Sequence, residues 1–514
     1  FANYQLDATQ SGEDVRFSSI PLALDRGNNS KAGAASKLTA CRLFDGATSL
    51  TTGSNVINPT ETATTTSPTA HTFTFDVSLT VPKGTVKSLA LKCNLSGSAD
   101  ASSQFQWGLI AAPSITVTGV TSSNDVTETI TASDGQIMTA STGSLVISLD
   151  SSSPSYKVAA AGTTGNIAGV IKFRAANEAV NLEKIGLKLT NTASSSASDL
   201  ILVSVWDGAT KVGEATFVGA TTVATSTFTS NVLLPKDADK TLTVKVDLAP
   251  IGTSLPGTQG HLIAIDYAAN SAVVGTGAAS GTNITPTGTT AVNGIRVFKS
   301  YPTVAKLAIP SSSLVSGSDA DLYRFSVTAN SAGPVGIFKF TINLATSSTP
   351  SGTSSTTVTS LKIKAYTDSG FSSEVSGFDP QGQLNDTITG LVSSGNTDVT
   401  MTASSQSQDY LQIPAGSTYY FRVVGTITMT GSPTGAQVVT NIQGDAAFPV
   451  TVYSSLGGTG FMASTTAIDA DTHDDFIWSP NATTTTPTTG DDWTNGYQVL
   501  GLPSDNMDNV TLSK

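Results

Sequence analysis

Apolar and polar residues alternate along most of the chain, and three stretches share one irregular form of that alternation. In each, an alternating run closes on an alanine (Ala8, Ala175 or Ala329), a polar turn follows, and an apolar ladder begins. A period of two predicts half-buried strands, and a step of three inside it predicts a β-bulge, because the facing side would otherwise flip. The ladders step by two, three, two and two: Val15, Phe17, Ile20, Leu22 and Leu24; Val180, Leu182, Ile185, Leu187 and Leu189; Val335, Ile337, Phe340, Ile342 and Leu344.

The repeating unit is a whole domain, because the ladders begin at Val15, Val180 and Val335. No helical periodicity lies between the strands, and clusters of Gly, Ser, Thr and Pro separate them, as in two-sheet sandwiches. We therefore predict an all-β fold of tandem immunoglobulin-like antiparallel β-sandwich domains with an irregular C-terminal tail. The predicted domains are 1–142, 143–300 and 301–474, and the Thr-rich tail is 475–514.

The first repeat differs from the other two at its start. A strand-like stretch precedes the alanine run in the second repeat (143–165) and in the third (301–321), but none stands before Phe1 in the first. We expect domain 1 to lack this leading strand, which leaves an open sheet edge at Tyr4, Leu6 and Ala8. The alternatives are that a preceding part of a precursor supplies the strand, or that domain 1 has fewer strands.

The tail offers candidate strands to fill this edge in a neighbouring copy. Tyr497 and Val499, and likewise Val510 and Leu512, alternate as an inserted strand requires. Donation from one copy to the next is a head-to-tail contact that does not close on itself, so it propagates into a filament or lattice.

Two cysteines, Cys41 and Cys93, each lie at an inward position of a strand-like run. We favour a buried disulfide between neighbouring strands, as in exported proteins. The alternative is two unpaired buried thiols that pack as small apolar side chains.

Composition narrows the classes of partner. Only 12% of the residues are charged, and the formal net charge is −12. An acidic surface argues against nucleic acid as a partner, and no apolar run reaches the roughly 20 residues that span a bilayer, so we do not expect a membrane-embedded chain. The first residue is Phe rather than Met, which indicates either a processed product or a portion of a longer chain. A removed secretion signal would fit, so we expect a protein at the cell surface or outside the cell.

The chain shows no constellation typical of an enzyme, since it has three histidines and no recognisable nucleophile or phosphate-binding motif. We do not expect a catalytic residue or a cofactor. The candidate for a metal is Ca²⁺, whose oxygen ligands would be Asp469, Asp471, Asp474 and Asp475. The alternative is a solvated acidic loop. Trp478 and Trp493 are candidates to stack on sugars.

Three kinds of segment in the sequence resemble those of a known group of proteins: the strand ends "FDGAT" and "WDGAT", the run "PKGTVKSLALKCNL", and the closing segment "FIWSPNATTTTPTTGDDWTNGYQVLGLP". In these the chain resembles tandem immunoglobulin-like exported surface proteins of candidate phyla radiation bacteria. The resemblance implies a secreted or cell-surface protein of sandwich domains and supplies no active-site residues. We expect a structural protein whose copies polymerise into a filament or surface layer. The alternative is a monomeric adhesin or stalk that binds glycans.

Overall fold

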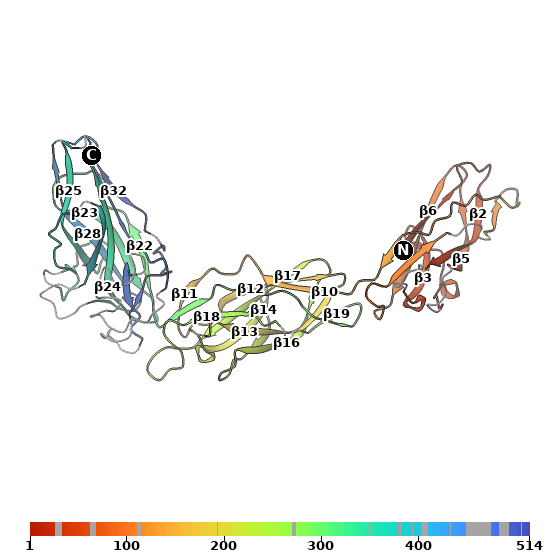
Figure 1. Ribbon diagram of the computed structural model, residues 1–514, viewed down its shortest axis with the longest axis horizontal. Coiled ribbons are helices and arrows are strands. Elements are labelled where there is room, and N and C mark those ends of the chain that lie inside the picture. The colour runs from red at the N-terminus through yellow and green to blue at the C-terminus, as the bar shows by residue number, and fades with distance from the viewer. Residues whose placement is uncertain are drawn as a thin grey trace.

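The computed structural model describes the chain except residues 26–32, 62–67, 110–114, 193, 270–273, 350–351, 379, 381, 393, 402–409, 432, 449–473, 483–492 and 505. Apart from three short 3-10 turns, all regular structure in the described residues is β-strand, which confirms the all-β prediction. Figure 1 shows three β domains in a row, with the N-terminus in the first domain and the C-terminus at the far end of the third. No helix in the described part of the chain is long and apolar enough to cross a membrane.

Domain 1 is a sandwich of two sheets around a core that extends from Ala8 to Ala140. The first sheet has the order β1 (Ala2–Asp7), β6 (Val86–Leu95), β3 (Leu38–Asp45) and β4 (Thr48–Ser49). The second has the order β5 (Thr69–Val81), β2 (Val15–Asp25), β7 (Gln104–Gly108) and β9 (Ile137–Thr139), and β8 (Val117–Gly119) also pairs with β2.

Domain 2 repeats this arrangement and adds strands to it. Its first layer has the order β10 (Ser144–Leu149), β12 (Asn166–Ala176), β17 (Asp239–Leu248) and β14 (Leu200–Asp207). The second has the order β16 (Val223–Leu234), β13 (Val180–Thr190), β18 (Leu262–Tyr267), β21 (Ile295–Phe298) and β11 (Lys157–Ala160). The two layers are joined through β15 (Thr210–Ala215), and β19 (Val274–Gly277) and β20 (Asn283–Ile284) pair alongside β13.

Domain 3 has the same two layers. The first has the order β22 (Pro302–Leu307), β23 (Gly317–Ala329), β28 (Thr418–Thr430) and β25 (Ser355–Tyr366). The second has the order β31 (Thr494–Asn495), β30 (Phe476–Ser479), β24 (Val335–Ser347), β29 (Gln437–Ile442) and β32 (Val510–Ser513), and β26 (Ser394–Thr400) and β27 (Leu411–Ile413) also pair with β24.

The predicted bulges are present in all three ladder strands. The register shifts after Phe17 in β2, after Leu182 in β13 and after Ile337 in β24, which is the odd step of each ladder. The extra residue lets the apolar residues on both sides of the step face the same core. All fifteen ladder residues are buried.

The C-terminal segment belongs to domain 3, which corrects its prediction as an irregular tail beyond residue 474. The strands β30, β31 and β32 lie in the second sheet of domain 3, and β32 pairs antiparallel with β29. Asp445 is fully buried beneath this segment and accepts the backbone N–H groups of Asp475, Phe476 and Gly496 at 2.8, 3.2 and 2.6 Å. Burial raises the pKa of Asp445 to about 8, against the opposing effect of these hydrogen bonds.

The same segment, together with Phe448 before it, also contacts residues at the junction between domains 2 and 3. The Arg296 guanidinium lies 3.5 Å from the centroid of the Phe448 ring, and Lys299 Nζ donates to the Asn481 carbonyl at 2.7 Å. Cation–π contact and charge-assisted hydrogen bonds hold best where water is excluded. The C-terminal segment is therefore committed to its own chain at several points.

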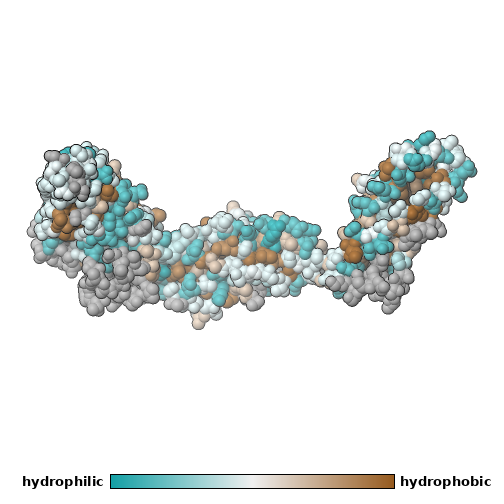
Figure 2. Space-filling view, turned by 45° about the horizontal axis from the view of Figure 1, so that its top comes forward, coloured by the Kyte–Doolittle hydropathy of each residue, from teal (hydrophilic) through white to brown (hydrophobic). Residues whose placement is uncertain are grey.

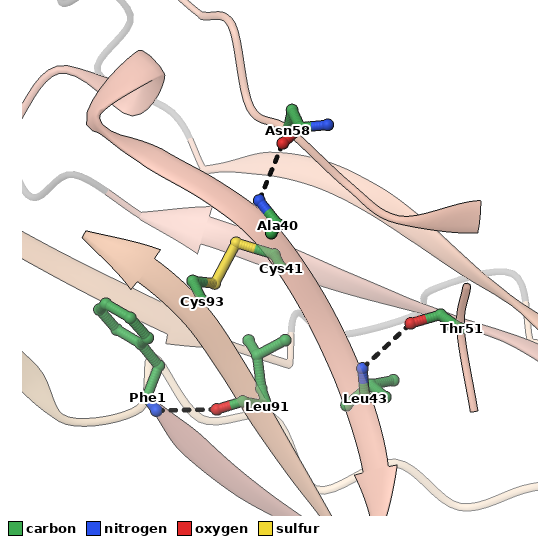
Figure 3. The surroundings of a disulfide bond; sticks show 8 residues. All are labelled: Phe1, Ala40, Cys41, Leu43, Thr51, Asn58, Leu91 and Cys93. Carbon is green, nitrogen blue, oxygen red and sulfur yellow. Dashed lines mark hydrogen bonds between the residues drawn. A yellow bond between two sulfur atoms is a disulfide. The ribbon is translucent and has the colours of Figure 1, made fainter. Parts of the chain in front are cut away.

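The predicted disulfide between Cys41 and Cys93 is confirmed. It joins the neighbouring strands β3 and β6, and Figure 3 shows it beside the hydrogen bond from the Phe1 ammonium to the Leu91 carbonyl, whose length is 2.8 Å. Cys41 is fully buried in the core of domain 1. The bond therefore ties β6, the neighbour of β1, to the next strand, β3.

We expect that replacing both cysteines by alanine will destabilise domain 1 by about 4 kcal/mol. The disulfide closes a loop with a sequence separation of 52, and the loop-entropy relation gives about 4 kcal/mol for a loop of that size. The measurement is the urea midpoint of domain 1 in the full chain, with and without reducing agent. The double variant should not respond to reducing agent. An unchanged midpoint in the variant would show that the disulfide adds no stability.

Candidate functional site: two unpaired strand edges in domain 1

Strand β1 of domain 1 is structurally equivalent to β12 and β23, because all three make the same pairing on one side. Leu6 stands opposite Lys87, as Phe173 stands opposite Lys240 and Val327 opposite Tyr419. These partner positions follow the turn prolines Pro82, Pro235 and Pro414 at the same spacing. The comparison of the three domains is therefore residue by residue.

The other side of β1 is where the domains differ. In domain 2, β10 pairs antiparallel with β12, and in domain 3, β22 pairs antiparallel with β23. Within the described residues, β1 pairs with β6 alone and ends its sheet. An unpaired edge presents a row of backbone N–H and C=O groups to any extended segment.

Along this edge, the inward side chains of β1 are partly uncovered in the described residues. Tyr4 and Leu6 are half-buried, whereas their equivalents in domains 2 and 3 are almost completely buried. In the sibling domains the leading strand places Ile147 opposite Phe173 and Val304 opposite Val327, and both side chains are buried. Each apolar side chain that is left uncovered forgoes roughly 1.5–3 kcal/mol. The equivalents of Tyr4 are Ile171 and Phe325, and those of Leu6 are Phe173 and Val327.

Tyr4 also carries an unsatisfied polar group. Its hydroxyl is buried and has no hydrogen-bond partner among the described residues, and burial raises the pKa of this phenol. A buried hydroxyl without a partner is costly.

A second unpaired edge lies on the other sheet of domain 1, at β9. Met138 stands opposite Phe105, at the position that Ile295 holds in β21 and Leu512 holds in β32. Met138 is 44% exposed, whereas Ile295 and Leu512 are 1% and 3% exposed. The outer edge of β9 has no pairing partner in the part of the chain that the structure describes. A core position of this domain therefore faces solvent.

In the sibling domains this second edge is also covered. Strand β11 runs parallel to β21, and residues 312–314 run parallel to β32 through a bridge between Ser313 and Ser513. Leu314 is buried in the core of domain 3. In each sibling one continuous segment, 144–160 or 302–314, covers the first sheet, crosses the end of the sandwich and covers the second. The two edges of domain 1 therefore form one site, which we call the slot.

Tyr4, Leu6 and Ala8 lie at this slot, but the residues predicted to fill it do not. Val510 and Leu512 are 7% and 3% exposed inside domain 3, and Val499 is buried there too. The Tyr497 ring packs against Tyr156 of domain 2, with 5.1 Å between ring centroids. These residues alternate between apolar and polar because they belong to strands that are half-buried in their own chain. The prediction that these four residues are free to be donated is therefore corrected.

Of the four predicted calcium ligands, the structure describes Asp474 and Asp475. Asp469 and Asp471 lie outside the described residues. Asp474 is buried beside Lys339, whose Nζ lies 3.1 Å from it and 3.0 Å from Asp398, and the carbonyl of the buried Asp475 accepts a backbone hydrogen bond. The described residues hold no cluster of three or more His, Cys, Asp or Glu side chains that could bind a metal.

The tryptophans predicted as sugar platforms are also packed inside the protein. Trp478 is fully buried and donates to the Asn495 carbonyl at 2.7 Å, and Trp493 packs edge-on against Phe338 and Tyr410. Neither ring presents a free face to solvent. Met138 is the one slot residue that sequence reasoning missed. Aligning the stretch "IMTA" with the closing strands of the other repeats would have been the signal.

Comparisons with known proteins do not identify a relative. No protein-family profile and no curated protein sequence matches the chain. Among solved structures, the C-terminal domain of the antigen I/II polypeptide BspA of Streptococcus agalactiae is 10% identical, with a TM-score of 0.17, over 58% of this chain and 95% of that one. The collagen adhesin CNA of S. aureus is 13% identical, with a TM-score of 0.10, over 58% of this chain and 85% of that one. Similarity at this level shows neither a shared fold nor a shared function, and none of these matches is a candidate phyla radiation protein.

Proposed function

We propose that this protein is an extracellular structural subunit whose copies assemble head to tail into a filament or surface layer, with domain 1 of one copy accepting a strand from the next. The observation that carries the proposal is the slot, where two strand edges and Met138 are uncovered although the sibling domains cover the same positions. The disulfide supports an oxidising, extracellular setting. The low charge and the formal net charge of −12 support a protein partner rather than nucleic acid.

The arrangement of the chain supports a propagating contact. An acceptor in domain 1 and a donor elsewhere are different surfaces, and contacts between unlike surfaces generate open polymers rather than closed pairs. Each strand of the described residues, β32 included, already pairs inside its own domain. The donor is therefore an extended segment of the neighbour that lies outside these strands. Among the coloured residues on the face in view, Figure 2 shows hydrophobic surface in separate patches.

We expect self-assembly that depends on the slot. The wild-type chain should form regular filaments or sheets in negative-stain electron microscopy and fast-sedimenting species in sedimentation velocity. Met138→Asp and Leu6→Asp should each abolish these species, because a charge in the slot opposes burial of the incoming apolar side chains. Met138 is already exposed, so its substitution should leave domain 1 folded.

The matched control is Val77→Asp, which introduces the same charge on β5, at the opposite edge of the same sheet, where Val77 is 80% exposed. This variant should assemble as the wild type does. Assembly that persists in both slot variants would place the interface elsewhere. A wild-type chain that stays monomeric at high concentration would overturn the proposal in favour of a monomeric stalk or adhesin.

A further inference from the structure

We infer that domain 3 forms a covalent cross-link on its own, an amide bond between the side chains of Lys339 and Asp474, with Asp398 as the proton relay. The observation that points to it is a buried amine held between two carboxylates. Lys339 Nζ lies 3.1 Å from Asp474 Oδ2 and 3.0 Å from Asp398 Oδ2. The inference depends neither on the slot of domain 1 nor on self-assembly.

Three segments of the second sheet of domain 3 bring these side chains together. Lys339 lies on β24, where it stands opposite Thr400 of β26 on one side and Ile477 of β30 on the other. Asp398 precedes Thr400 by two positions on β26, so both side chains leave the same face of that strand. Asp474 lies just before β30. The amide bond would therefore tie the C-terminal segment to the strand at the middle of the sheet.

The pair is shielded from water. Lys339 is 4% exposed and Asp474 is 7% exposed, although Lys339 alternates with the core residue Phe340 and so lies on the outer face of its sheet. Lys184 holds the same position after the bulge in β13 of domain 2, where it is only half-buried. Burial of this lysine is therefore particular to domain 3 and not a property of the repeat.

Burial favours condensation of the amine with a carboxyl group. Two charges taken out of water carry a desolvation cost that their mutual attraction repays only when the geometry is excellent, and an amide bond removes both charges. Groups held in contact also react as parts of one molecule, with effective concentrations on the order of 10⁵–10⁸ M when they are well oriented. The equilibrium therefore shifts from the separate groups toward the amide.

The reaction starts from an ammonium group. Burial lowers the pKa of Lys339, but the Asp398 and Asp474 carboxylates outweigh this effect and raise the pKa. Asp398 accepts one proton from Nζ, and the freed lone pair attacks Cγ of Asp474. One C–O bond of Asp474 then breaks, and the two protons lost by the nitrogen leave with that oxygen as water, relayed through Asp398. One ammonium and one carboxylate thus become one amide and one water, with no change in net charge and no co-reactant.

Thr341 positions the relay and the chain beside the acceptor. Its hydroxyl donates to Asp398 Oδ1 at 2.8 Å, which leaves Oδ2 toward the amine, and its backbone N–H donates to the Asp475 carbonyl at 2.8 Å. The second bond holds the residue next to Asp474. Burial also raises the pKa of Asp475 to about 7, so a second acid near the pair is partly protonated at neutral pH.

The test is the intact mass of the full chain, measured by high-resolution mass spectrometry after unfolding and reduction of the disulfide. We expect the wild-type chain to be lighter than its sequence by one water molecule. Digestion and tandem mass spectrometry should find one branched peptide that joins Lys339 to Asp474, and trypsin should not cut after Lys339. A wild-type chain with the full sequence mass would overturn the cross-link and leave an ordinary buried ion pair.

Three variants assign the roles. Lys339→Arg keeps the positive charge and Asp474→Ala removes the carboxyl group, and both should have their full sequence mass. Both should also run more slowly than the wild type in a denaturing gel, because they lack the closed loop with its sequence separation of 135. Asp398→Asn still accepts the Thr341 hydrogen bond but cannot relay protons, so it should slow the water loss at least tenfold after pulse-labelled synthesis. An unchanged rate would overturn the relay.

The matched control is Lys184→Arg, which makes the same change at the equivalent position of domain 2 and should keep the water loss and the branched peptide. An aspartate before a glycine, such as Asp134, can also lose water by closing a ring with its own backbone. Water loss that persists in Lys339→Arg would identify that reaction and overturn the cross-link. A branch at Asp398 in place of Asp474 would overturn the assigned partner.

Discussion

Fusing residues 144–167 directly before Phe1 is expected to abolish self-assembly and to raise the melting temperature of domain 1. The graft keeps the strand register. Because Ala8 corresponds to Ala175, Phe1 takes the position of Ala168, directly after the grafted residue 167. The grafted segment would occupy the slot from within its own chain. An intramolecular strand has a large advantage in effective concentration over one from a neighbour, so donation between copies should stop.

The stability gain comes from covering Tyr4, Leu6 and Met138, offset by the entropy of ordering the added residues. A net gain of about 1 kcal/mol would raise the melting temperature by about 3 °C for a domain of this size. The measurements are differential scanning calorimetry of the full chain and negative-stain electron microscopy.

The control is the same graft carrying Asp at the position copied from Ile147. This side chain is buried in domain 2, so a charge there should prevent insertion, and the control chain should assemble and melt like the wild type. Normal assembly by the unmodified graft would show that the slot is not the acceptor. A graft that blocks assembly without changing the melting temperature would also count against insertion.

Truncation after Pro503 is expected to destabilise domain 3 by about 5 kcal/mol or more and to unfold it in part. The deletion removes β32, with the buried side chains of Met507, Val510 and Leu512, and each contributes roughly 1.5–3 kcal/mol. It also removes the Asp508 carbonyl, which accepts a 3.0 Å hydrogen bond from the hydroxyl of Tyr323. A buried phenol would then lose its partner.

Thermal unfolding and limited proteolysis of the full chain would measure this loss. A pair of point variants gives a finer test, because Leu512 faces the core and Thr511 faces solvent on the same strand. Leu512→Asp should lower the melting temperature of domain 3 strongly, and Thr511→Asp should leave it nearly unchanged. Equal behaviour of the two variants would contradict the position of β32 in the core. If truncation destabilises domain 3 as expected, a loss of assembly on truncation would reflect the unfolding of domain 3 rather than the removal of a donor strand.

Much of the slot was predictable because the chain contains three repeats of one domain, which can be compared with one another. The repeats at Ala8, Ala175 and Ala329 showed that a leading strand precedes this run in the second and third copies, and this comparison located Tyr4 and Leu6 without any structure. Met138 was not predictable in the same way. Its position depends on which strand pairs with β7, and that pairing links residues far apart in the sequence.

The C-terminal segment also shows what a local sequence pattern cannot decide. Val510 and Leu512 alternate as a strand does, and that local pattern is correct. The pattern does not say which sheet receives the strand, because a donor strand and a strand of the home domain have the same period. Pairing with β29 and the anchoring of the segment through Asp445 decided the matter.

By itself, the sequence determined most strands, their bulges and the threefold repeat of the domain, because each of these depends on residue spacing along the chain. It favoured the disulfide, because Cys41 and Cys93 both lie at inward positions of strand-like runs. Only the tertiary structure decided that the C-terminal strands belong to domain 3 and that β1 and β9 present one shared slot. The physical reason is that side-chain period is a local property, whereas burial and edge pairing depend on contacts between segments that are distant in sequence.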